Sequence, residues 1–385
     1  MFEFTSGNNG RTVFVTFPKF RRGIPVTLGT ISTKKTGQSH LIRPYPDWSW
    51  HSQSSCDGMT SVFRTQIDKC NRLWVIDSGV VDLSLSTRRR QCQPKLLAFY
   101  LSNNHLAGKH VFPDSVLKEN SLLTNVVVEV RGTQNDCRDT FAYVADTMGY
   151  SLLVLDVREN RSWNIESNSM YPYPPYGFFH TNNVEFNLMD GILGMSLSPM
   201  DKGDRVLYYH SLASVRESWV PTSVLKDEEY FTSNPVSASK RFKTSEEARK
   251  AQSAAQAFDK NGILYFGMVD NSLSCWNHRN PFTRENIHEI QKDNVNLQFA
   301  SGLKVVTNGD DEEEIWLITN RFQITMVDQL DPTETNFRIL KGNLEELTRN
   351  TRCKHNTSIT FPNRNSENDN QQQQERPTNS GYGRK

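Results

Sequence analysis

Long apolar runs, an excess of charge of one sign and helical periodicity are all scarce in this sequence of 385 residues. The longest apolar runs, such as Leu152–Leu155, have the length of a strand, so the sequence predicts no membrane span. Lys+Arg number 44 and Asp+Glu 43, and the net charge of +1 gives no field that would favour nucleic acid or a membrane surface. The one good helix candidate is Glu246–Phe258, which we expect to be a loop helix.

Known catalytic signatures are also missing. The sequence contains no GxSxG elbow, HExxH helix, P-loop or GxGxxG fingerprint. We expect no metal and no cofactor. Among the scattered histidines, His180 is the one we would place near a site as a general base, although a satisfied loop histidine is the commoner role of such a residue.

Cysteine occurs only six times and never as a CxxC pair, which argues against a zinc ribbon or a redox motif. The even number and wide spacing predict three disulfides in an oxidising compartment, with six free thiols in a cytosolic protein as the alternative. Six cysteines allow fifteen pairings. We favour Cys275 with Cys353, because that bond would tie the fifth repeat described below to the C-terminal segment. The others are Cys56, Cys70, Cys92 and Cys137.

Secretion is compatible with two N-x-S/T sequons, at Asn160 and Asn356. The first ten residues, MFEFTSGNNG, have neither a basic n-region nor an apolar h-region. We expect a secreted protein whose signal peptide is absent from this sequence, the alternative being a protein that is not secreted. Residues 361–385 are polar, rich in Gln and Asn, and devoid of aliphatic side chains, so we expect a disordered tail.

What the sequence does contain is a recurring pattern of short strands. Ser61–Ile67 alternates apolar and polar residues, a polar turn follows, and Leu73–Ile76 is a dense apolar run, which together predict a β-hairpin. Six β-rich runs follow a polar or glycine turn at intervals of roughly 50–70 residues, as a propeller blade of about 40–50 residues plus loops requires. They are Gly10–Val15, Asn71–Ile76, Asp139–Val144, Asp190–Met195, Asn261–Phe266 and Glu314–Ile318. We predict an all-β, six-bladed β-propeller over residues 1–360.

Propeller ligands usually bind at one mouth of the central channel, beside the starts of the inner strands. If each run above is the second strand of a blade, the inner strands begin near Thr60-Ser61, Thr124-Asn125, Asn182-Asn183, Ser253 and Ser301. Of these, Thr60, Asn183 and Ser301 are candidate ligand contacts, and solvation of the mouth is an equally good explanation. The aromatic segment Tyr171–His180, which includes Phe179, is either a ligand wall or a rigid packed connection. Asp77 and Asp146 occupy equivalent turns and could pair an ammonium, although capping the turn is the more common role.

Several blocks carry a family resemblance: RRGIPVTLGTIS, PYPDWSW, CDGMTSVFRTQIDKCNRLWVIDSG, YGFFHTNNVEF, ILYFGMVDNSLSCWN and IWLITNRFQ. In this order, between Arg11 and Cys353, they resemble the Yellow/major royal jelly protein family of insects. The resemblance implies a secreted six-bladed propeller with disulfides. In amine-binding relatives an Asn-x-aromatic element contacts the ligand, and the matching residues here are Asn320 and Phe322, with Ser301 as a nearby hydroxyl.

The resemblance implies several functions, because relatives are associated with cuticle and melanin pigmentation, dopachrome conversion, biogenic-amine binding and nutrition. We favour binding of a small aromatic amine or catechol-derived ligand at the channel mouth, where a phenyl face and an amide suit such a molecule. The alternatives are a dopachrome tautomerase, which needs a positioned general base, and a structural or signalling protein of the cuticle that acts through its surface.

Overall fold

Six antiparallel sheets follow one another along the chain in the computed structural model, which describes residues 4–7, 12–36, 39–51, 55–84, 86–133, 136–308 and 310–354. Blade one contains β1 (Phe4–Gly7), β2 (Thr12–Thr16), β3 (Leu28–Thr36) and β4 (Ser39–Pro44). Blade two contains β5 (Val62–Ile67), β6 (Arg72–Asp77), β9 (Lys95–Tyr100) and β10 (Leu106–Val111). Blade three contains β11 (Leu123–Val130), β12 (Thr140–Asp146), β13 (Ser151–Asp156) and β14 (Arg161–Ile165).

The second half of the ring repeats this arrangement. Blade four contains β17 (Ile192–Leu197), β18 (Val206–Ser211), β19 (Ser218–Pro221) and β20 (Lys243–Thr244). Blade five contains β21 (Ser253–Phe258), β22 (Ile263–Met268), β23 (Ser272–Asn277) and β24 (Ile287–Lys292). Blade six has three strands, β25 (Ala300–Thr307), β26 (Glu313–Asn320) and β27 (Phe337–Asn343).

Short elements connect the blades. Two further pairs of strands are β7 (Val80–Val81) with β8 (Arg89–Arg90), and β15 (Phe178–Thr181) with β16 (Val184–Asn187). The α-helices are α1 (Thr222–Leu225), α2 (Glu228–Ser233), α3 (Pro235–Ser239), α4 (Phe322–Met326) and α5 (Leu344–Thr348). No helix in the part of the chain that the structure describes is long and apolar enough to cross a bilayer.

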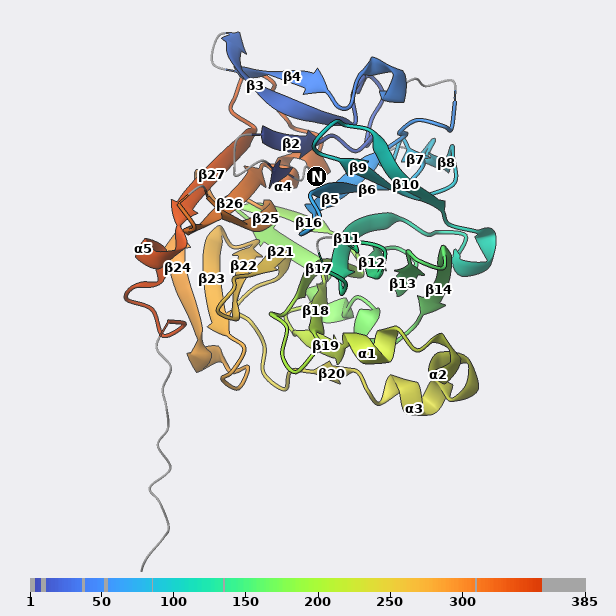
Figure 1. The fold of residues 1–385 in the computed structure, drawn as a ribbon. Helices are drawn as coiled ribbons and strands as arrows, with labels where there is room; N and C mark the ends of the chain where they lie inside the picture. The colour runs from blue at the N-terminus through green and yellow to red at the C-terminus, as the bar shows by residue number, and fades with distance from the viewer. Residues whose placement is uncertain are drawn as a thin grey trace, which may run out of the picture. The chain divides into compact units, whose positions relative to one another are not determined.

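The first strand of each blade is the innermost, and consecutive inner strands contact one another in the closed order β1, β5, β11, β17, β21, β25 and back to β1 (Figure 1). The predicted six-bladed β-propeller is therefore confirmed. Blade one is built from the N-terminal strands and blade six from the C-terminal ones, with no strand shared between them. This junction is held by packing of Val15 against Ile318 and by an ion pair between Arg21 and Asp328 at 2.8 Å.

The channel is crossed by one side chain. The inner strands β17, β21 and β25 each shift register near their start, at Leu193, Ala254 and Ser301. A β-bulge leaves one residue outside the ladder, and all three bulge carbonyls accept hydrogen bonds from the buried guanidinium of Arg64 on β5. The distances are 3.0 Å to Leu193 and 2.7 Å to both Ala254 and Ser301. Arg64 thus links blade two to blades four, five and six.

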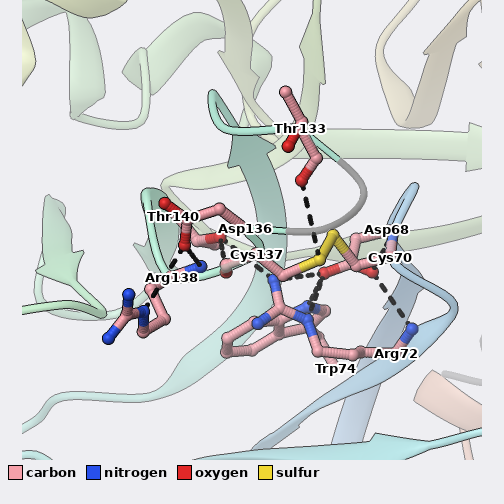
Figure 2. The surroundings of a disulfide bond; sticks show 9 residues. All are labelled: Asp68, Cys70, Arg72, Trp74, Thr133, Asp136, Cys137, Arg138 and Thr140. Atoms are coloured by element: carbon pink, nitrogen blue, oxygen red, sulfur yellow. Dashed lines mark hydrogen bonds and ion pairs between the residues drawn. A yellow bond between two sulfur atoms is a disulfide. The ribbon is translucent and has the colours of Figure 1, made fainter.

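Three disulfides are present, as predicted, and Cys275–Cys353 is one of them. Cys56–Cys92 joins the segments before β5 and β9 of blade two. Cys70–Cys137 joins the β5–β6 turn of blade two to the loop before β12 of blade three (Figure 2). Beside it, Arg72 donates to Thr140 Oγ1 at 3.0 Å and pairs with Asp68 at 2.7 Å, so the same two blades are also bridged by polar contacts.

Two expectations about the strands are wrong. The expected helix Glu246–Phe258 is absent, because Ser253–Phe258 forms the inner strand β21. Its alanines, Ala254, Ala255 and Ala257, are buried between blades, and this packing overrides their helix propensity. The run Asp190–Met195 contains the start of the inner strand β17, so the second strand of blade four is β18. Asn182-Asn183 is accordingly not an inner-strand start.

The two predicted sequons fall in different parts of the chain. Asn160 is exposed in the turn between β13 and β14. Asn356 and the expected disordered tail, residues 361–385, lie outside the described residues.

Candidate functional site

A small hairpin separates blades three and four and belongs to neither sheet. Its strands are β15 and β16, and Asn182 and Asn183 form the turn with φ of +49° and +63°. Positive φ at both central residues is the geometry of a type I′ turn, which asparagine tolerates well. Phe179 pairs directly with Phe186 across the strands. Because side chains alternate along a strand, both rings face inward while His180 faces out.

Four phenylalanines pack together on the inner side of this hairpin, and two of them belong to its own strands. Phe179 stacks on Phe186 with ring centroids 5.0 Å apart, and Phe322 of α4 meets Phe186 at 5.8 Å and Phe299 at 4.6 Å. The cluster also includes Leu193 and Ala254, whose carbonyls bind Arg64. We call these four rings the mouth cluster. They pack with Leu193 and Ala254, which lie at the starts of the inner strands β17 and β21.

Polar groups lie beside the mouth cluster. Asn320 donates from Nδ2 to Ser301 Oγ at 2.8 Å, and both residues are buried. Gln323 on α4 is only 1% exposed, and its Nε2 donates to Gln298 Oε1 at 2.8 Å. Its own Oε1 has no donor among the described residues. A buried acceptor without a donor costs roughly 1–3 kcal/mol, so this oxygen can accept a bond from an incoming N–H or O–H group.

Side-chain hydrogen bonds attach the hairpin to the neighbouring loops at its tip and at its base. At the tip, Thr181 Oγ1 donates to the carbonyl of Val269 at 2.9 Å, and Asn182 Nδ2 donates to the carbonyl of Asn294 at 2.8 Å. At the base, Gln252 Nε2 donates to the carbonyls of Tyr176 and Phe178, both at 3.1 Å. A further tip bond runs from Asn271 Nδ2 to Asn182 Oδ1 at 2.6 Å. The hairpin is therefore fastened by side-chain hydrogen bonds at both ends and by the packing of Phe179 and Phe186 between them.

The two predicted carboxylates, Asp77 and Asp146, already accept hydrogen bonds within the fold. Asp77 is buried and accepts hydrogen bonds from the amides of Thr60 and Ser61, both at 2.7 Å, and pairs with Lys95 at 3.3 Å. Asp146 is also buried and accepts bonds from Ser121 Oγ and from the amides of Leu122 and Gly149. Each fastens the start of an inner strand to the turn after a second strand, which is the capping role that the sequence left open.

Four of the remaining predicted residues lie together, and the other three lie apart from them. Ser301, Asn320, Phe322 and Phe179 come together at the mouth cluster. Thr60 is buried on blade two beside Asp77, and Asn183 is exposed at the hairpin tip. His180 has a side chain that is 58% exposed and lies 3.3 Å from Glu185 on the outer face of the hairpin. The structure therefore does not direct its imidazole toward the cluster.

A further carboxylate, Asp190, lies between the hairpin and the inner strand β17. It is half-buried, and no hydrogen bond or ion pair to its carboxylate occurs among the described residues. Burial raises the pKa of Asp190 to about 7, while the charge of the Arg88 guanidinium opposes this rise.

Comparison with known proteins identifies the family of this chain. Residues 60–353 match the family described as Major royal jelly protein. This chain belongs to the Yellow/major royal jelly protein family. It is 34% identical to "Dopaminechrome tautomerase" of Drosophila melanogaster, over 90% of this chain and 75% of that protein. It is 32% identical to "Major royal jelly protein 9" of Apis mellifera, covering 90% of this chain and 80% of that one.

A third relative of this Yellow-family chain is "Protein yellow" of Drosophila melanogaster, with 32% identity over 89% of this chain. The chain spans 63% of the length of that relative. The predicted membership of the Yellow/major royal jelly protein family is thus confirmed.

Sequence reasoning missed three residues of this candidate site: Phe186, Phe299 and Gln323. A signal for Phe186 was available, because TNNV has the form of a hairpin turn and places Phe179 opposite Phe186. Phe299 and Gln323 gave no local signal, since their approach depends on how blade six closes against the hairpin. Asp190 was seen only as a turn residue.

Proposed function

We propose that this chain binds a small aromatic amine or catechol-derived molecule at the channel mouth, beneath the β15–β16 hairpin. The observation that carries this proposal is the buried Oε1 of Gln323, an acceptor without a donor among the described residues, on the residue that follows Phe322 in α4. An ammonium or hydroxyl can supply the missing hydrogen bond, and a phenyl face attracts both an aromatic ring and a cation. The Asn320–Ser301 pair offers a second polar contact.

Binding requires the hairpin to move, because the four rings of the mouth cluster pack directly on one another. A ligand ring inserted next to Phe322 would take the place of Phe186, and the hairpin would rise from its tip contacts on Val269 and Asn294. Lids of this kind exclude water from a site once they close again over the ligand.

Secretion and a role in pigmentation complete the proposal. Three disulfides suit an oxidising compartment, and related chains bear the name Protein yellow. Asn160 is exposed, as a glycan acceptor must be.

A second candidate function is tautomerisation of an aminochrome, the oxidised and cyclised form of a catecholamine. It is favoured by the relative named Dopaminechrome tautomerase, which is 34% identical across 90% of this chain. The two functions are compatible, since an aminochrome is itself a catechol-derived ligand.

Calorimetric titration with dopamine, serotonin and dopaminechrome tests the binding function. We expect saturable binding, which Phe322→Ala weakens by about 1–3 kcal/mol, the value of a buried aromatic contact. Phe178→Ala is the matched control, because this ring belongs to the same hairpin but is exposed. Equal affinity in Phe322→Ala and the wild type would exclude the mouth cluster as the site.

The same titration distinguishes the contribution of the amine group to the affinity from that of the catechol ring. Gln323→Met removes the buried acceptor, so it should weaken dopamine binding more than binding of 4-methylcatechol, which lacks the amine. An equal loss for both ligands would show that Gln323 does not receive the ammonium.

A further inference from the structure

The three arginines of the basic run Arg88-Arg89-Arg90 interact with different partners. Arg89 pairs with Asp82 at 3.1 Å, and Arg90 donates to the carbonyl of Lys118 at 2.8 Å. Arg88 is half-buried and donates to the carbonyl of Asn120 at 3.3 Å. The charges of Asp190 and Asp146 both raise the pKa of Arg88 against the effect of its burial, and the charge of Asp190 contributes more.

Asp190 lies at the rim of the mouth cluster. Leu188 on one side of it in the chain and Leu193 on the other pack with the four phenyl rings. Its backbone carbonyl accepts a hydrogen bond from the amide of Ala213, another member of that packing group, at 3.1 Å. Asp190 thus lies in the chain between two residues that pack with the mouth cluster, next to the hairpin whose movement we propose.

Two titratable groups interact with the charge of Asp190. Arg88 precedes β8, and Tyr150 lies in the turn after β12. The Tyr150 hydroxyl donates to the carbonyl of Met189 at 3.1 Å, which places its ring beside Asp190, and Tyr171 packs on Tyr150 with centroids 5.3 Å apart. The carboxylate thus has a cation and an aromatic surface near it, and no residue that the structure describes donates a hydrogen bond to it.

We propose that Asp190 accepts a proton from an aminochrome at the rim of the mouth, and that Arg88 stabilises the negative charge that develops on the substrate oxygen. This inference rests on the tautomerase function proposed above. The C–H bond of one ring methylene breaks, and its electrons move through the conjugated ring onto a quinone carbonyl oxygen, which takes up one proton and leaves a quinone methide isomer. Loss of one proton from the neighbouring methylene, with protonation of the second carbonyl oxygen, then completes the aromatic dihydroxyindole. Two protons leave carbon and two are taken up by oxygen, so no oxidant or reductant is consumed.

The protonation behaviour of Asp190 suits this role. A general base works best when its pKa is near the operating pH, and burial raises the pKa of Asp190 to about 7.

The same shift determines how the stability of the fold depends on pH. Because the folded pKa lies above the unfolded value of 3.8, the fold loses stability as pH rises from that value toward 7. Removing the charge with Asp190→Asn should therefore leave the protein at least as stable at pH 8.

The test is the rate of dopaminechrome conversion by the full chain. We expect Asp190→Asn to lower kcat by about 100-fold or more, the usual contribution of a general base, while dopamine affinity by calorimetry stays unchanged. The kcat of the wild type should rise with pH through about 7, and this rise should vanish in the variant. Arg88→Gln should lower kcat and move this rise to higher pH, because the Arg88 charge opposes the rise in the pKa of Asp190. Glu185→Gln, an exposed carboxylate of the same hairpin, is the control.

The outcomes separate the two proposals. A wild type that converts dopaminechrome, together with an Asp190→Asn variant of equal kcat, would overturn the assignment of Asp190 and leave the tautomerase function standing. A wild type without any conversion would overturn the tautomerase function and the assignment with it, while amine binding is judged by its own titration.

Discussion

Replacing Arg64 with Met is expected to lower the free energy of unfolding by about 3–5 kcal/mol, the scale of removing one partner from a buried charged network. The guanidinium donates to bulge carbonyls of Leu193, Ala254 and Ser301, which come from three different blades. Methionine fills much of the same volume but removes the donor from all three carbonyls. Leu193 keeps a bond from Asn125 Nδ2 at 2.7 Å, so the loss of about 1–3 kcal/mol for each buried acceptor applies to Ala254 and Ser301.

Denaturant unfolding followed by tryptophan fluorescence measures this loss. Arg158→Met is the control, because Arg158 is about half exposed and its nearest carboxylate, Asp136, is 3.9 Å away. A surface change of this kind should stay within about 0.5 kcal/mol of the wild type. If the Arg64 variant unfolds at the same denaturant concentration as the control, Arg64 does not hold the blades together.

Removing the Cys275–Cys353 disulfide is the second large effect we expect. Both cysteines are buried, and the bond closes a loop with a sequence separation of 78 residues. Loop-closure entropy then predicts a loss of about 4–5 kcal/mol in the double variant Cys275→Ala/Cys353→Ala. The bond also fastens the chain after α5 to β23 of blade five, where Asn277 Nδ2 donates to the carbonyl of Cys353 at 3.1 Å.

Limited trypsin digestion locates the effect. Cleavage after Arg349 and Arg352 should accelerate in this variant, because the segment that carries them loses its covalent attachment. The matched variant Cys56→Ala/Cys92→Ala removes a bond within blade two, so it should not accelerate cleavage at these arginines in the folded protein. Equal cleavage in both variants would show general destabilisation instead of release of the C-terminal segment.

Local patterns in the sequence predict the fold well, because each blade forms its own hairpins. Asn71–Ile76, Asp139–Val144 and Asn261–Phe266 all contain the second strand of a blade, as expected. The pattern misled us where inter-blade packing decides. Ser253–Phe258 is alanine-rich yet forms an inner strand. Arg64 looks like an ordinary polar residue of an alternating strand, and its place in the channel follows only from ring closure.

The candidate site was partly predictable for the same reason. Family resemblance identified Asn320, Phe322 and Ser301, and the structure brings them together with Phe179. The acidic turn residues Asp77 and Asp146 have the right chemistry for an amine, but their oxygens are used by neighbouring amides. Asp190 has the same side chain and no such bonds. Sequence cannot distinguish these cases, because the difference lies in which backbone amides approach each carboxylate.

The most direct test of the channel-mouth site is a crystal structure of the protein with dopamine. We predict the catechol ring against Phe322, the ammonium within hydrogen-bond distance of Gln323 Oε1, and the β15–β16 hairpin displaced from the other rings. Dopamine bound elsewhere, with Phe179, Phe186, Phe299 and Phe322 still packed on one another, would contradict the proposed site.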